Sequence, residues 1–219
     1  MKNSNSKFIA SAVLFLMFLT LTAALCFIDV KAIGPNGSNV GLAGVNGFFK
    51  DLFGISTLWY DITEILGYIA LASAGVFAII GAYQLVTRKS LKKVDLDIYA
   101  LAGLYVLVMA AYVFFEIFVI NCRPILTEGE LEASFPSSHT MIVLCFIGGA
   151  IHQIRRRVKS RPIRTALEIT CVAVIFMTVL GRMICGVHWF TDIIGGVLLA
   201  LAIVFLYTAV VDLLDTRTN

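Results

Sequence analysis

Long apolar runs separated by short polar segments fill most of the chain. Six runs come close to the ~20 residues that a helix needs to cross a lipid bilayer. They lie at about residues 8–30, 58–87, 98–120, 136–153, 165–185 and 189–214. The pattern predicts an all-α fold, a bundle of six transmembrane helices that forms a single domain over residues 1–219.

Two segments near the start of the chain allow more than one interpretation. The first apolar run is longer than the ~7–15 residues usual for the core of a signal peptide, so we expect an uncleaved helix rather than a cleaved leader. In the following loop, apolar side chains recur at helical spacing between Phe48 and Phe53, with Lys50 and Asp51 on the opposite face. This spacing predicts a short interfacial helix, with an irregular structured loop as the alternative.

The composition places these helices in a membrane. Hydrophobic residues make up 59% of the chain and charged residues 14%, with a mean hydropathy of +0.93. A soluble domain carries roughly 25% charged residues, so a soluble domain and a disordered chain are both excluded. The five cysteines have no short metal-binding spacing, and the sequence predicts no metal and no cofactor.

Basic residues set the expected orientation of the helices. Thirteen of the 17 lie in segments on one side of the predicted membrane, including Lys2, the run 155–157 and Arg217, and four lie on the other. Cytoplasmic loops carry the excess of Lys and Arg, so both termini are predicted in the cytoplasm of a multi-pass cell-membrane protein. The basic runs are therefore interpreted as orientation signals, and no nucleic-acid partner is expected.

Three polar clusters interrupt the apolar pattern, all on the predicted extracytoplasmic side. Arg123-Pro124 follows the third run, and residues 135–140 open the fourth. Arg182 ends the fifth run, and His188 and Asp192 follow at four-residue spacing, which places them on one helix face. Arginine forks match phosphate oxygens, and a carboxylate beside an imidazole orients it as a base or nucleophile.

The second cluster adds an anion site. Ser137, Ser138 and His139 follow Pro136, which suits the first position of a helix because it lacks an N–H group. Helix N-termini with free N–H groups bind anions. Together the three clusters favour phosphoryl transfer without a metal.

The ordered motifs Arg-Pro, Pro-Ser-x-His and Arg-x5-His-x3-Asp resemble those of the type 2 phosphatidic acid phosphatase superfamily, which are six-helix membrane lipid phosphatases. The resemblance covers about residues 116–192. It implies that His188 is the nucleophile and forms a phosphohistidine, that Asp192 orients it, and that His139 is the general acid.

The resemblance also implies a phosphate-binding set around these three residues. Arg123 and Arg182 correspond to the family's phosphate clamps. Ser137 and the backbone N–H groups near Ser138 and His139 would complete the cradle for the phosphoryl oxygens.

Three positions depart from the family pattern. Glu116 stands where the first motif has a lysine, Ser138 replaces a glycine, and Gly181 replaces a serine. A carboxylate cannot clamp phosphate, so Glu116 fits equally an ion pair with an arginine of the site and a role in binding a polar headgroup or a cation. The loss of a cation and a hydroxyl predicts lower activity or an altered headgroup preference.

The resulting expectation is dephosphorylation of a lipid phosphate or diphosphate at the outer face of the membrane. A lipid phosphotransferase and a catalytically degenerate lipid-binding or transport protein are the alternatives. The expected partners are the lipid substrate and membrane lipids, and the oligomeric state stays open. Asp61 and Glu64, on the outer turn of the second predicted helix, fit either a solvated face or the entrance to the site.

Overall fold

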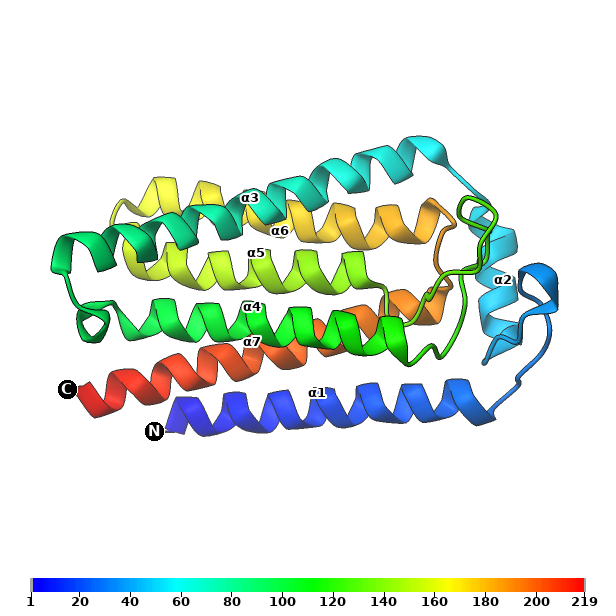
Figure 1. Cartoon of the computed structure of the whole chain (residues 1–219), viewed down its shortest axis with the longest axis horizontal. Helices are drawn as coiled ribbons and strands as arrows, with labels where there is room; N and C mark the ends of the chain where they lie inside the picture. Colours follow the sequence, from blue (N-terminus) through cyan, green and yellow to red (C-terminus); the bar gives the residue numbers. More distant parts are fainter. Residues whose placement is uncertain (1, 219) are drawn as a thin grey trace.

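The computed structural model describes residues 2–218, with side-chain surroundings for residues 4–216, so the side chains of Lys2 and Arg217 lie outside the described part. The described chain is all-α, as predicted (Figure 1). Its α-helices are α1 (Lys2–Phe27), α2 (Ala43–Phe53), α3 (Thr57–Arg88), α4 (Leu96–Ile117), α5 (Ser138–Arg157), α6 (Arg161–Ile184) and α7 (Phe190–Thr218).

Five of these helices, α1, α3, α4, α6 and α7, are long and apolar enough to cross a membrane. The central helix α5 lacks such a window because it combines Gln153 with the basic run 155–157. It packs against α3, α4, α6 and α7, so its polar groups find partners inside the bundle instead of facing lipid. The sixth membrane crossing therefore stays a prediction.

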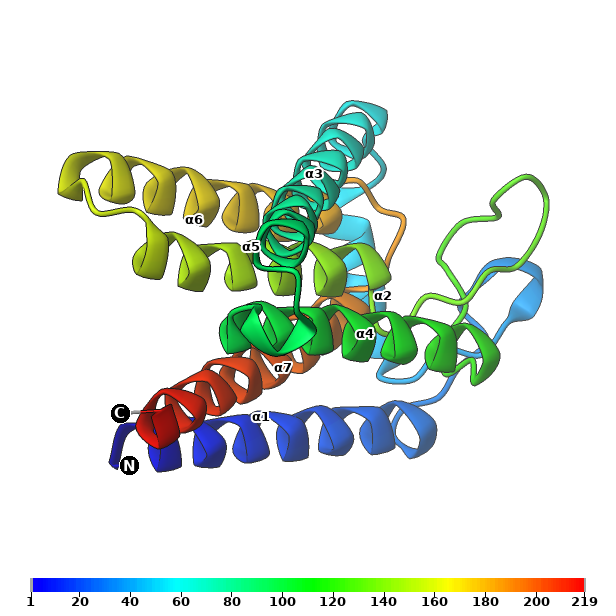
Figure 2. The ribbon, with the colours of Figure 1, turned by 60° about the vertical axis from the view of Figure 1, so that its left-hand side comes forward.

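The bundle is arranged around α5. Figure 2 shows α3 and α6 on one side and α1 on the other, where α1 runs along α7. Near one end, Phe18 of α1 stacks on the loop residue Phe135, and Phe115 of α4 meets both rings edge to face, with ring centroids 5.6–6.1 Å apart. The start of α1 and the end of α7 lie at the opposite end of the bundle (Figure 1); the cytoplasmic placement of this end remains a prediction.

The short helix predicted around Phe48–Phe53 is present as α2, which lies across the end of the bundle away from the termini (Figure 1). Phe49 stacks on Phe190 of α7 with ring centroids 3.9 Å apart. Asn46 is fully buried; its side-chain amide donates to Thr191 Oγ1 at 2.9 Å, and its oxygen accepts the Thr191 N–H at 3.1 Å. These contacts fix α2 to the first turn of α7.

Candidate active site

The three polar clusters of the sequence meet at the end of the bundle that carries α2. Arg123 follows α4, His139 lies in the first turn of α5, and Arg182 lies in the last turn of α6. His188 occupies the turn between α6 and α7, close enough to Arg123, Arg182 and His139 to feel their charge. Asp192 lies in the first turn of α7, so five helices or their connections contribute to one site.

His188 is oriented by Asp192 through a bridging serine. The nearest nitrogen of His188, Nδ1, is 4.0 Å from Asp192 Oδ2, which is too long for a hydrogen bond. Ser134 Oγ lies between them, 2.5 Å from Asp192 Oδ2 and 3.0 Å from His188 Nδ1. Because Ser134 donates its proton to the carboxylate, its oxygen accepts from Nδ1–H. The lone pair of His188 is then on Nε2, the form that a nucleophile needs.

The surroundings of His188 also favour its neutral form. The ring is buried, and burial lowers its pKa well below the usual value near 6.5, with the charges of Arg123 and Arg182 acting in the same direction. Asp192 is held in turn, since Oδ2 also accepts the backbone N–H of Trp189 at 2.9 Å. The result is an uncharged, fixed imidazole facing two cations.

His139 is held by α3 rather than by its own helix. Its Nε2 lies 2.7 Å from the backbone carbonyl oxygen of Thr63, so Nε2 carries a proton and donates it. Its other nitrogen, Nδ1, lies 3.7 Å from Glu64 Oε1. The Nδ1 side of the ring therefore faces the ionic part of the site.

The two arginines are held differently. The side chain of Arg182 is only 3% exposed; its Nη2 donates to Glu64 Oε1 at 2.5 Å and its guanidinium lies over the ring of Tyr60. Its buried Nε has no hydrogen-bond partner among the described residues, which leaves a donor for a ligand oxygen. Arg123 is half-buried and forms an ion pair with Glu132 at 3.1 Å. Each arginine is thus matched by one carboxylate.

Comparison with known proteins identifies a family over the part of the chain that contains these residues. The family model of the PAP2 superfamily matches residues 98–214, a span that holds every predicted site residue. The chain belongs to the PAP2 superfamily. A crystal structure described as the first transmembrane PAP2 type phosphatidylglycerolphosphate phosphatase, from Bacillus subtilis, has the same fold, with a TM-score of 0.61 and 19% identity over 95% of this chain and 97% of that one. No curated protein matches. The PAP2 chain is a multi-pass membrane protein.

The Pro-Ser-x-His segment of this PAP2 site begins its helix two residues later than the sequence predicts. The helix α5 starts at Ser138, and Ser137 is its N-cap, with Ser137 Oγ accepting the N–H of Thr140 at 3.4 Å. Pro136 precedes the cap instead of occupying the first helical position. The Ser137 N–H donates to the Asp192 carbonyl at 2.9 Å, so Ser137 ties α5 to α7. The N–H groups of Ser138 and His139 belong to the first turn, where no acceptor exists within the helix.

Glu116, the main departure from the PAP2 pattern, lies exposed in the last turn of α4. It lines a small cavity together with Ser134 and Ser138. The ion pair that the sequence allowed with Arg123 or Arg182 is formed by other carboxylates, because these arginines pair with Glu132 and Glu64. A role toward a headgroup or a cation stays the open interpretation.

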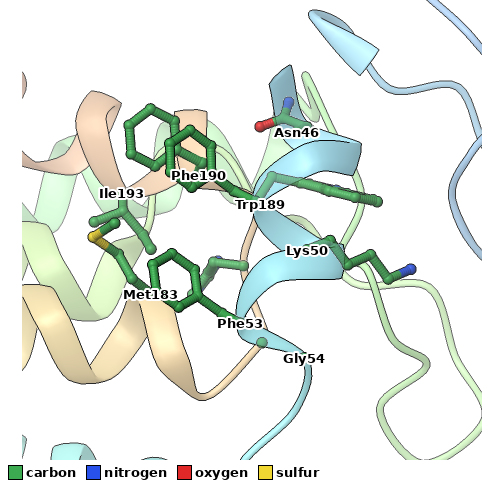
Figure 3. Close-up of a pocket in the computed structure, with 11 residues that line it drawn as sticks. Asn46, Lys50, Phe53, Gly54, Met183, Trp189, Phe190 and Ile193 are labelled. Atoms are coloured by element: carbon green, nitrogen blue, oxygen red, sulfur yellow. The ribbon is translucent and has the colours of Figure 1, made fainter. Parts of the chain in front are cut away.

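A cavity of about 10 Å³ lies behind His188, between α2 and the turn from α6 to α7. Figure 3 shows Phe53 of α2 reaching toward Met183 and Ile193 there. Gly186 has φ +73°, and a Cβ at this position would lie 2.2 Å from the carbonyl oxygen of Gly54. The turn that carries His188 thus needs a glycine and leaves room for at most about one water molecule behind the ring.

Sequence reasoning missed two residues of this site and undervalued a third. Ser134 lies three residues before the Pro-Ser-x-His cap and gave no signal beyond that proximity. Asn46 lies in a glycine-rich stretch of the sequence, where a polar residue is unremarkable, although the structure places it in α2. Glu64 was assigned either to a solvated face or to the entrance, and the structure places its carboxylate on Arg182.

Proposed function

We propose that this protein, acting as one domain over residues 1–219, is a metal-independent lipid phosphatase that works through a phosphohistidine at the outer face of the cell membrane. One observation carries the proposal: a buried, neutral His188, oriented through Ser134 by Asp192, faces Arg123 and Arg182. Membership of the PAP2 superfamily supports it.

In the first step, His188 Nε2 attacks the phosphorus atom while Arg123 and Arg182 bind the non-bridging oxygens. A P–N bond forms as the P–O bond to the lipid breaks. Binding of the anionic phosphate favours protonation of His139 on Nδ1, and that proton passes to the leaving oxygen, while Nε2–H of the same ring stays bonded to the Thr63 carbonyl. The serine-mediated link to Asp192 stabilises the positive charge that develops on His188.

In the second step, water attacks the phosphohistidine. His139, now neutral at Nδ1, accepts a proton from the water, and the P–N bond breaks to release inorganic phosphate and neutral His188. The two steps share one set of oxygen-binding groups, which stabilise charge in both transition states.

The substrate is proposed to be a lipid phosphate or diphosphate whose apolar chain stays in the bilayer. The excess of basic residues on the far side supports an extracytoplasmic site. Phosphatidylglycerol phosphate is the first lipid to test, because the structural neighbour from Bacillus subtilis is named for its action on it. Phosphatidic acid and an undecaprenyl diphosphate complete the panel.

Phosphate release from this panel in the presence of a chelator tests the proposal. We expect His188→Ala to lower kcat by about 10⁴-fold or more, as removal of a nucleophile does in comparable triads. His152→Ala is the matched control, because His152 lies toward the other end of α5, near Tyr207. Substantial turnover by folded His188→Ala protein, or strict dependence on a metal ion, would contradict the proposal.

Trapping the intermediate gives an independent check. Acid-labile label from a ³²P-lipid should stay on wild-type protein quenched in the first turnover and be absent from His188→Ala. Including candidate acceptors in the same assay separates hydrolysis from phosphotransfer, since only transfer produces a labelled acceptor.

A further inference from the structure

The helix α3 forms a socket for the imidazole of His139. The Thr63 carbonyl binds Nε2 at 2.7 Å. One turn later, a Cβ built on Gly67 would lie 2.6 Å from Cε1 and 2.9 Å from Nε2 of His139. Only a residue without a side chain fits there, so the ring lies directly against the α3 backbone.

Glu64, next to Thr63, connects this socket to the phosphate clamp. The same oxygen, Oε1, lies 2.5 Å from Arg182 Nη2 and 3.7 Å from His139 Nδ1. The Arg182 side chain is 3% exposed and the Glu64 side chain 35%. The guanidinium is therefore fixed inside the protein, while the carboxylate that pairs with it is partly open to solvent.

Gly181, a departure from the family pattern, allows this arrangement. A Cβ at position 181 would lie 2.5 Å from Thr63 Cγ2 and 3.0 Å from Trp59 Cε3. The usual serine would push α3 away from α6. The missing hydroxyl and the carboxylate on Arg182 thus have one cause, the close approach of the two helices.

We propose that Glu64 is a positioning residue that occupies the place of a substrate phosphate oxygen in the resting site. Its carboxylate aligns Arg182 and lies 3.7 Å from Nδ1 of His139, the ring nitrogen that faces the ionic part of the site. An incoming phosphate displaces Glu64 and takes over both contacts. The inference rests on the proposed function for the role of His139, but the competition for Arg182 does not depend on turnover.

The charges around His139 come from three directions. Burial disfavours the protonated ring, and so do the charges of Arg182 of α6 and Arg123 of the loop after α4, whereas the Thr63 carbonyl and Glu64 of α3 favour it. The neutral ring of His188 lies nearby. Glu64 is thus the carboxylate among these groups that offsets the two arginines. Removing its charge should make the ring lose its proton at lower pH.

Binding of inorganic phosphate to the full-length protein, measured by calorimetry in detergent, tests the competition. Glu64→Gln keeps the shape of the side chain and removes its charge, so we expect phosphate affinity to rise about 3- to 10-fold. Asp61→Asn, which neutralises an exposed carboxylate three residues earlier on α3, is the control and should leave the affinity unchanged. Unchanged or weaker phosphate binding by Glu64→Gln overturns the proposal.

Kinetics test the proton on His139. Glu64→Gln should lower KM and kcat together and move the basic limb of the kcat/KM profile to lower pH, and Glu64→Asp should restore the limb. A purely structural role would not lower KM and kcat together in this way. A basic limb that stays in place overturns the inference.

Gly67→Ala gives a second variant that leaves Glu64 intact. The added methyl group should displace the His139 ring, so kcat should fall at least 10-fold while phosphate affinity stays within a factor of two. A wild-type kcat for Gly67→Ala would contradict the claim that His139 is positioned by packing against α3 at Gly67. If wild-type protein releases no phosphate from any lipid, the proposed function fails, while the phosphate-binding comparison still decides whether Glu64 competes for Arg182.

Discussion

Two arginines at one end of the bundle, Arg156 and Arg157, and two at the other, Arg123 and Arg182, are neutralised to different degrees. At the end that carries the termini, Arg156 binds Asp215 through two nitrogens at 2.6 and 3.0 Å and Asp97 through Nε at 3.1 Å. Arg157 binds Asp97, Asp95 and Gln153.

At the site end, Arg182 and Arg123 have one carboxylate each, and the Nε of Arg182 is left without a hydrogen-bond partner in the described part of the chain. Fully matched arginines tie helices together, whereas half-matched ones keep donors for a ligand. The difference separates a structural use of the residue from a functional one.

Exchanging the arginines for alanine tests this difference most strongly. Arg182→Ala should lower kcat/KM by about 10²- to 10³-fold, the usual effect of removing a group that stabilises transition-state charge, with little change in thermal stability. Arg157→Ala should lower the melting temperature and leave turnover per folded molecule near wild type. Both kcat/KM and the melting temperature are measured for both variants. A large loss of stability in Arg182→Ala together with a large loss of turnover in Arg157→Ala would refute the comparison.

At the end of the bundle that carries the termini, we expect a substitution to lower stability without lowering turnover. Asp97 is buried and contacts both Arg156 and Arg157. Asp97→Asn removes the charge that both need, and we expect the free energy of unfolding to fall by about 2 kcal/mol, less than for a fully buried pair because the arginines are partly exposed. Denaturant titration in mixed micelles measures it. A loss of kcat without a loss of stability would contradict this assignment.

A smaller effect is expected from the bridging serine. Ser134→Ala leaves His188 Nδ1 and Asp192 Oδ2 4.0 Å apart with nothing between them, so the ring loses its orienting partner. We expect kcat to fall about 10- to 30-fold with KM little changed. Ser73→Ala, which removes a partly exposed hydroxyl within α3 that bonds only the Ala70 carbonyl, is the control. Equal losses for both serines would argue against the bridge.

The smallest expected effect is a shift in pH dependence. Because burial and the arginine charges lower the pKa of His188, its neutral, nucleophilic form persists as the pH falls, and the acidic limb of kcat/KM due to His188 should lie below about pH 6.5. Arg123→Gln removes one positive charge, which should move this limb to higher pH. Measuring the profile for both proteins checks the direction, and a shift to lower pH would contradict it.

The sequence was sufficient for the features that depend on local pattern. Hydropathy predicted the long helices, and helical spacing predicted the short α2 because its aromatic residues mark one face. The ordered motifs identified the family, which the match over residues 98–214 confirms. The hydropathy of residues 136–153 also predicted a crossing by α5, which stays a prediction, because Gln153 and the run 155–157 are stabilised by neighbours that pattern alone does not reveal.

The contacts that complete the site join residues far apart in the chain. Glu64 and Arg182 are separated by 118 positions, Asn46 and Thr191 by 145, and Ser134 and His188 by 54. None of these residues has a neighbour in sequence that signals its partner. Their roles follow from how closely the helices pack, which depends on residues such as Gly67 and Gly181.

The tight contact at Gly181 constrains how this site can change during evolution. A Gly181→Ser substitution that restores the family residue would meet Thr63 and Trp59, so we expect it to be deleterious in the present background. A smaller residue at position 63 would have to come first to open the space. The effect of a serine at position 181 should therefore depend on the residue at position 63, because α3 and α6 touch at this point.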